Sequence, residues 1–280
     1  MVINMQFNQE QNELLIIFSQ ILEYGYKKLQ TVSLNERRTK PKKRILYLMM
    51  GAVQSFAEGI HKLLYPPKVL DKQAEVLYRS LAETLINLQY IFCCPNQDNA
   101  LKFMIYSAHD RIDFAEKYKK FMIAHPRWKM DFGPIKTPVD WDNLIQKTEN
   151  QITQFNQHIK SKPVKEMPDL KGRAQTVDRF NKLKRKRLEK INMEKTLVQY
   201  YKFFSQITHL TMPGLERFLV VTPTSRKVVL DGTPEDFSRM AAITFILYWA
   251  VLRFFLKEFK VFNKAEFKPY EDYSKKYTKK

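Results

Sequence analysis

Cysteine is nearly absent from this sequence of 280 residues, which holds two adjacent ones, Cys93 and Cys94. Adjacent cysteines rarely bridge each other, so the disulfide framework that stabilises many small secreted domains is excluded. A zinc site built from cysteines is excluded too, because two thiolates are too few ligands. This usage fits a reducing, cytoplasmic environment, and we expect both thiols to be small apolar fillers at a helix end.

Glycine is also scarce, with seven in the chain. Sheet-rich folds with many tight turns usually need more, so the low count favours long helices joined by short loops. The hydrophobic content of 44% is typical of a folded protein and not of a disordered one. The fold class that we predict is therefore all-α.

Long apolar runs are missing as well. The most apolar stretch, Met240–Leu252, has thirteen residues between two arginines, which is too short to cross a bilayer. We expect it to be a buried core helix. The polar N-terminus, Met1–Glu13, shows no secretory signal, so the sequence predicts no membrane span.

Apolar residues recur at helical spacing along most of the chain, and prolines mark where helices stop. The pattern predicts a bundle of about seven helices, approximately over residues 7–30, 44–64, 68–92, 99–124, 141–160, from the middle of segment 160–190 to residue 210, and 233–262. A short β-hairpin is expected near residues 218–230. We expect one helical domain over residues 1–262 and a basic, flexible tail at residues 263–280.

What the chain has in excess is positive charge. It carries 48 basic and 29 acidic residues, a formal net charge of +19. Such an excess attracts polyanions: nucleic acid, anionic lipid surfaces or an acidic partner protein. Twelve of the basic residues lie in segment 160–190, and its run Lys184, Arg185, Lys186 and Arg187 is a candidate binding site. The alternative is that these cations are only solvated surface.

Two polar rows lie on helices that are otherwise apolar. Arg79, Glu83, Asn87 and Tyr90 fall at i, i+4, i+8 and i+11 on the third helix, and Tyr201, Ser205 and His209 fall at i, i+4 and i+8 on a later one. Buried polar groups need partners, so we expect the two rows to face each other.

If they do, Arg79, Glu83, Ser205 and His209 are candidate catalytic residues. His209 would be the proton carrier, because its charge changes near neutral pH. Asn87, Tyr90 and Tyr201 are then candidate binding residues. The alternative is an ion pair between Arg79 and Glu83 and a satisfied core histidine. No metal-ligand or phosphate-loop motif is present, so no metal or cofactor is expected.

Both rows also carry a resemblance. Residues Arg79–Ile91 read R-S-L-A-E-T-L-I-N-L-Q-Y-I, and this helix with the later Y-x-x-x-S-x-x-x-H resembles an uncharacterised bacterial helical family, a domain of unknown function. The resemblance spans roughly Arg44 to Gly214 and implies an all-helical build without a settled activity. The chain is more loosely similar to HEPN-type helical domains, although none of its histidines has an arginine at their R-x-x-x-x-H spacing.

The leading hypothesis is a basic helical protein that engages RNA or another nucleic acid within a bacterial defence or toxin-like system. A second is a non-catalytic interaction module with a structural polar core and an acidic protein partner. A third is a small-molecule hydrolase or sensor that uses Glu83 and His209.

Overall fold

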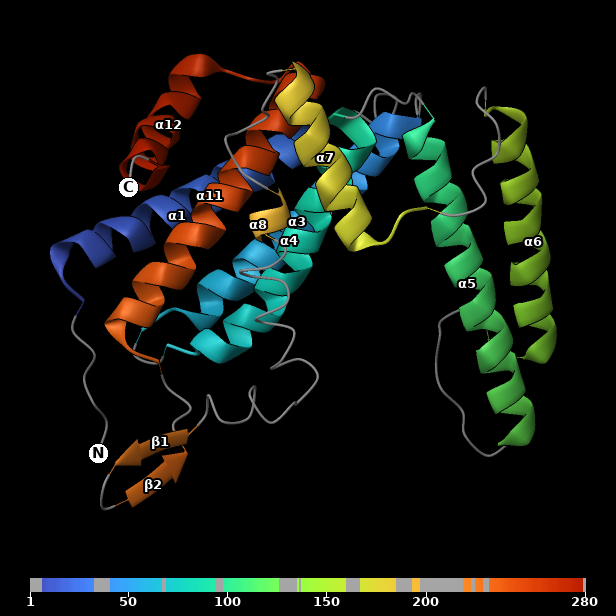
Figure 1. The fold of residues 1–280 in the computed structure, drawn as a ribbon, viewed down its shortest axis with the longest axis horizontal. Coiled ribbons are helices and arrows are strands. Elements are labelled where there is room, and N and C mark those ends of the chain that lie inside the picture. Colours follow the sequence, from blue (N-terminus) through green and yellow to red (C-terminus); the bar gives the residue numbers. More distant parts are fainter. Residues whose placement is uncertain are drawn as a thin grey trace. The chain divides into compact units, whose positions relative to one another are not determined.

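The computed structural model describes residues 7–32, 41–66, 69–93, 98–125, 135, 137–159, 167–184, 193–196, 219–222, 225–228 and 232–278. These residues contain nine helices and one two-stranded sheet (Figure 1), which confirms the all-α class. They form two compact units in place of the expected single domain. Unit 1 comprises Met1–Cys93 and Leu170–Lys280, and unit 2 comprises Cys94–Asp169.

The core of unit 1 is helix α11, Pro234–Glu258. It packs against α1 (Gln9–Thr31), α3 (Pro41–Leu63), α4 (Asp71–Cys93) and α12 (Lys264–Thr278). A helix that is apolar on most sides is stable only when surrounded, and fourteen residues of α11 are buried. The predicted core helix is therefore confirmed, and it is longer than its apolar run.

Within the described residues, α11 is the one helix that is long and apolar enough to cross a membrane by length and composition. Its most apolar stretch of 18 residues has a mean hydropathy of 1.6, and 67% of that stretch is buried inside the protein. The neighbouring helices thus already cover most of the apolar surface of α11.

Ring and hydrogen-bond contacts fix the directions of the helices in unit 1. Helix α1 runs parallel to α11, because Phe7 stacks on Phe237 near both N-terminal ends and Phe18 meets Phe245 further along. Helix α4 also runs parallel to α11, since their C-terminal halves meet through aromatic rings. Helix α3 runs antiparallel to them, so the end where α3 begins is the end where α1, α4 and α11 finish (Figure 1).

The C-terminal residues correct an expectation. Instead of a flexible tail after residue 262, Lys264–Thr278 forms helix α12, and the side chains of Phe267 and Tyr273 are buried. Glu266 of α12 forms an ion pair with Lys28 of α1, with 2.8 Å between Oε2 and Nζ. The many lysines and tyrosines of this segment led to the prediction of a flexible tail, although its apolar residues are spaced as in an amphipathic helix.

Two further helices of unit 1 are α7, Leu170–Lys184, and the short α8, Met193–Thr196. Helix α7 packs on α4. The carboxylate of Asp178 accepts the backbone N–H groups of Met193 and Glu194 at 2.9 and 2.8 Å, and so satisfies the first donors of α8. The rest of the long helix expected up to residue 210 lies outside the described residues.

The predicted hairpin is confirmed. Strands β1, Leu219–Thr222, and β2, Ser225–Val228, pair antiparallel, with Thr222 opposite Ser225. Two residues connect them, the length that a tight hairpin turn requires.

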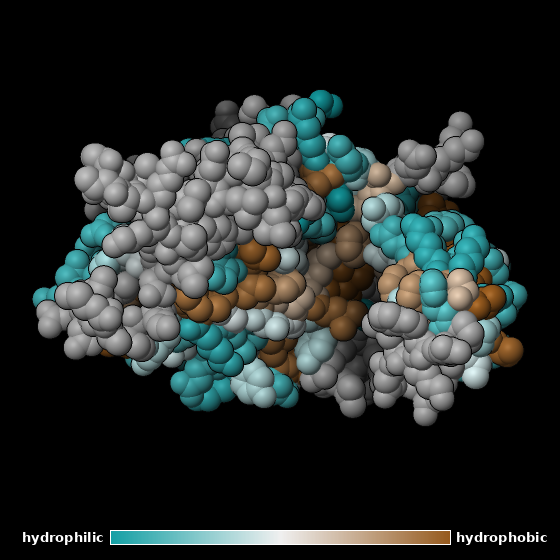
Figure 2. All heavy atoms as spheres, turned by 90° about the horizontal axis from the view of Figure 1, so that it is seen from below, coloured by the Kyte–Doolittle hydropathy of each residue, from teal (hydrophilic) through white to brown (hydrophobic). Residues whose placement is uncertain are grey.

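Unit 2 is a pair of helices, α5 (Asn99–Ala124) and α6 (Pro138–Gln157), which lie side by side (Figure 1). Trp141 at the start of α6 is buried and packs on the last third of α5, so the two helices are antiparallel. The Trp141 Nε1–H points at the Met122 sulfur, 2.9 Å away. Figure 2 draws one face of all the atoms of the protein, on which hydrophobic side chains (brown) gather among hydrophilic ones (teal).

Candidate functional site

The polar row of α4 is divided between core and surface. Asn87 and Tyr90 are buried, whereas Arg79 and Glu83 are half-buried. The Asn87 side-chain oxygen accepts a hydrogen bond from the Arg173 guanidinium of α7, 2.5 Å from Nη1. Because Arg173 is itself buried, this bond joins the two helices inside the protein, where a charge-assisted bond is strong.

The second row lies outside the described residues. Tyr201, Ser205 and His209 all fall there, so their approach to Arg79 and Glu83 stays a prediction. Arg173 was missed by sequence reasoning, because it is one of twelve basic residues in segment 160–190. The one available signal is spacing: Arg173, Ala174 and Val177 share one face of α7, and all three are buried.

A group of charged side chains, also missed from the sequence, joins the start of α4 to the start of α11. The fully buried carboxylate of Glu75 is paired with Arg239, 3.3 Å apart, and Arg239 also reaches Asp236 at 3.2 Å. Burial alone would raise the pKa of Asp236. Its hydrogen bonds from Thr233 and the charges of Lys72 and Arg239 outweigh burial and lower that pKa. The Asp236 carboxylate is therefore held as an ion by its partners, which suits a structural role.

A second polar group lies in the middle of the core of unit 1. The Tyr248 hydroxyl of α11 donates to the Gln54 side-chain oxygen of α3. The Gln54 amide donates in turn to the Leu22 carbonyl of α1 at 2.9 Å and to Glu58 at 2.6 Å. Burial first, and the negative charge of Glu58 second, raise the pKa of Tyr248 well above its usual value. The phenol therefore stays protonated and acts as a donor that links three helices.

Positive charge gathers where α3 begins and α11 ends, a surface that we call the basic end. Its members are Lys42, Lys43, Arg44, Lys257, Lys260 and Lys264. Lys43 Nζ lies 5.2 Å from the centre of the Phe259 ring, and Lys257 Nζ lies 5.7 Å from that of Phe262. Such cation–π contacts hold the ammonium groups without neutralising them.

The charge balance of the basic end is strongly positive. The first turn of α3 contains no acidic residue, although a helix N-terminus favours negative charge. Glu258 is the one carboxylate within the α11 part of this surface, Lys257–Lys264. Arg37, Arg38 and Lys40 precede α3 in the sequence and lie outside the described residues.

The predicted basic run is largely undescribed. Lys184 is the last residue of α7, its side chain is not described, and Arg185, Lys186 and Arg187 lie outside the described residues. The sequence placed the basic site on this run. The structure adds a separate cationic surface, where the start of α3 meets the end of α11 and the start of α12, which are far from α3 in the sequence.

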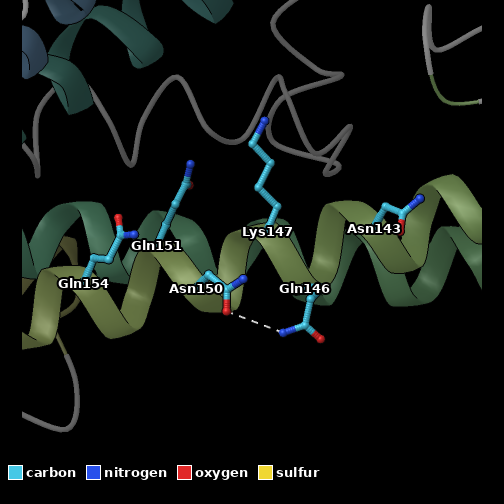
Figure 3. Close-up of a pocket in the computed structure, with 6 residues that line it drawn as sticks. All are labelled: Asn143, Gln146, Lys147, Asn150, Gln151 and Gln154. Atoms are coloured by element: carbon cyan, nitrogen blue, oxygen red, sulfur yellow. Dashed lines mark hydrogen bonds between the residues drawn. The ribbon is translucent and has the colours of Figure 1, made fainter.

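Two pockets in the described part of the chain are lined by polar residues. One of about 420 Å³ lies on the outer side of α6 and is lined by amide side chains and one lysine (Figure 3). Another, of about 320 Å³, lies between α7 and α8 and is lined by Gln175, Asp178, Arg179 and Glu194. The described ranges hold no group of three His, Cys, Asp or Glu side chains placed to bind a metal ion.

The comparisons with known proteins give one finding. Residues 43–226, more than half of the chain, match the model of a family of unknown function, DUF5677. This match confirms the resemblance to an uncharacterised family that the two polar rows carried, while the looser likeness to HEPN-type domains stays a prediction. No curated protein and no solved structure matches the chain.

Proposed function

This chain belongs to the family of unknown function DUF5677, and we propose that it engages RNA or another nucleic acid through its basic end. The supporting observation is the convergence of six cations from three helix ends, with Glu258 as the one carboxylate among the residues of its α11 part. A phosphate backbone is a polyanion that such a surface attracts.

Removing part of the basic end tests the proposal. In the variant Lys257→Ala, Lys260→Ala, Lys264→Ala, affinity for a fluorescein-labelled single-stranded RNA should fall. The slope of log affinity against log salt should shrink by about 2, since each lost phosphate contact on a single strand removes about 0.7. Fluorescence anisotropy between roughly 50 and 300 mM KCl measures both quantities.

A matched control separates local contacts from bulk charge. The variant Lys62→Ala, Lys275→Ala, Lys276→Ala also loses three exposed cations of unit 1, but outside the basic end. Its salt slope should stay close to that of the native chain. If both variants behave alike, or if the native chain binds no RNA at low salt, the proposal is wrong. A third variant, with Lys184, Arg185, Lys186 and Arg187 replaced by alanine, shows whether that run contributes as well.

The biological setting that we propose is a bacterial defence or toxin-like system in the cytoplasm. Expression of the native chain in a bacterial host should then slow growth or restrict phage. Glu83→Ala and His209→Ala should abolish this effect without lowering the melting temperature if the polar rows line a catalytic cleft. If Glu83 instead completes a closed ion pair with Arg79, its removal should cost on the order of 3 kcal/mol of stability.

A second candidate is a non-catalytic interaction module whose basic surface binds an acidic protein. The buried hydrogen bond between Asn87 and Arg173 favours it, because this part of the polar row is used to join α4 to α7. Binding of an acidic polypeptide such as polyglutamate in preference to RNA of equal charge would support this alternative. The third candidate, a small-molecule hydrolase or sensor using Glu83 and His209, predicts turnover of a small substrate by the pure protein.

A further inference from the structure

The outer side of α6 has an unusual composition. Its members, which we call the amide face, line the pocket of about 420 Å³ and are Asn143, Gln146, Lys147, Asn150, Gln151 and Gln154 (Figure 3). They recur at intervals of three and four residues, so they form one stripe along the helix. At a rise of 1.5 Å per residue the stripe is about 16 Å long.

This composition differs from that of an ordinary solvated helix face. The neighbouring α5 shows the usual pattern, an exposed ion pair between Asp113 and Lys117 at i and i+4. The amide face has five amides, one cation and no carboxylate. Asn is a poorer helix former than Glu, Lys or Ala, so its use at Asn143 and Asn150 is not explained by helix stability.

The hydrogen-bonding capacity of the amide face is largely unused within the described part of the chain. One bond joins two of its members, from Gln146 Nε2 to Asn150 Oδ1 at 3.5 Å (Figure 3). Each amide carries a carbonyl acceptor beside an N–H donor. Five such pairs in one stripe suit a ligand that also presents donors and acceptors side by side.

We propose that the amide face of α6 contacts the base edges of single-stranded RNA, an inference that rests on the nucleic-acid binding proposed above. Asn and Gln side chains pair with adenine through two hydrogen bonds at once. Lys147, in the middle of the stripe, supplies one cation for a phosphate, and no carboxylate of the face repels the backbone. The strand must be single, because the deep, narrow major groove of an RNA duplex does not admit side chains.

The test compares base preference with salt dependence. Fluorescein-labelled oligoadenylate, oligouridylate and oligocytidylate of equal length are titrated with the native chain and with the variant Asn150→Ala, Gln154→Ala. We expect the native chain to prefer oligoadenylate. The variant should lose at least fivefold in affinity for oligoadenylate, change less than twofold for the other two, and keep the native salt slope, because base contacts release no counterions.

Two further variants serve as controls. Lys147→Ala should weaken binding to all three oligomers alike and reduce the salt slope by about 0.7. Asn156→Ala, Gln157→Ala removes two exposed amides of the same helix that do not line the pocket, and it should bind as the native chain does. Misfolding is not expected in any of them, since alanine is the better helix former at exposed positions, and circular dichroism checks this.

The outcomes separate the two proposals. If the native chain binds none of the oligomers, the proposed function itself fails. If it binds them and loses affinity on removal of the basic end, but the amide variant keeps the native base preference, the proposed function stands and this inference is overturned. A uniform loss with a reduced salt slope in the amide variant would also overturn it, because the face would then contact phosphates.

Discussion

Replacement of Gly25 in α1 by alanine is predicted to destabilise the protein. A second substitution, Tyr248→Phe, should restore part of the lost stability. A Cβ atom at Gly25 would lie 1.8 Å from the Tyr248 hydroxyl oxygen and 3.0 Å from the Gln54 side-chain oxygen. The Tyr248 ring is fully buried and cannot move aside freely. In Gly25→Ala the hydroxyl must therefore leave its place, and Gln54 loses its donor.

The loss of stability expected for Gly25→Ala combines three effects. Overpacking a core costs about 1–3 kcal/mol, and a buried acceptor left without a donor costs about 1–3 kcal/mol more. The better helix propensity of alanine returns about 1 kcal/mol. The packing effects dominate, so Gly25→Ala should destabilise unit 1 by about 3 kcal/mol.

The effect of Tyr248→Phe on stability should have opposite signs in the native chain and in Gly25→Ala. Tyr248→Phe alone should destabilise the native chain by about 1–2 kcal/mol, because Gln54 loses its donor. In the Gly25→Ala background the same substitution should stabilise the protein by about 1 kcal/mol, since it removes the oxygen 1.8 Å from the new methyl group and leaves the Tyr248 ring carbon Cζ, at 3.0 Å, as a tight contact. Such a coupling between neighbours is what a double-mutant cycle measures.

Urea unfolding followed by hydrogen-exchange mass spectrometry suits this cycle, because peptides from α11 report unit 1 separately from unit 2. Gly51→Ala is the matched control: a Cβ there meets nothing within 4 Å, so the substitution should be neutral or stabilising by about 1 kcal/mol. If Tyr248→Phe destabilises both backgrounds equally, the hydroxyl is not the obstacle and the steric explanation is wrong.

Two other predictions concern unit 1. Burial lowers the pKa of His61 below its ordinary value of 6.5, although a hydrogen bond with the Leu15 backbone acts in the opposite direction. The unfolded chain then binds more protons below about pH 6.5, so stability should be full above that pH and fall as pH drops through the folded pKa. Urea midpoints measured from about pH 7.5 to 5 should show this loss, and His61→Gln should reduce it; equal slopes would exclude His61 as the cause. Asn87→Ala removes the acceptor of the buried Arg173 and should cost about 2 kcal/mol, whereas the exposed Asn156→Ala should leave the melting temperature within a degree or so; equal effects would argue against the buried bond.

Much of the fold could be predicted because its signals are local. The predicted helix start at residue 233 coincides with Thr233-Pro234-Glu235-Asp236, where the structure shows the capping box in which Thr233 and Asp236 satisfy each other's backbone groups. Thr137-Pro138-Val139-Asp140 carries the same signal at the start of α6. This helix was predicted from about residue 141, whereas α6 begins at Pro138, so the boundary was missed although its pattern was present.

The sites were harder to predict because they depend on contacts between distant residues. The bond from Arg173 to Asn87 spans 86 positions and that from Tyr248 to Gln54 spans 194. Helical spacing places a side chain on a face, but it does not say which helix that face meets. The basic end is a similar case, since half of its cations come from α3 and half from the end of α11, its connection to α12 and the first residue of α12.

Unit 2 is an insertion in the sequence of unit 1. Unit 2 occupies the middle of the sequence, while unit 1 is assembled from the segments before and after it. The segment that leaves unit 1 follows α4, and the segment that returns leads into α7, which packs on α4 through Asn87 and Arg173. The core of unit 1 (the host) is therefore held together by packing between α4 and α7, the helices that flank the inserted unit 2 (the guest) in the sequence. Such a guest can be lengthened, shortened or exchanged while the host keeps its packing, because insertions are best tolerated where the chain leaves and re-enters a domain at neighbouring points.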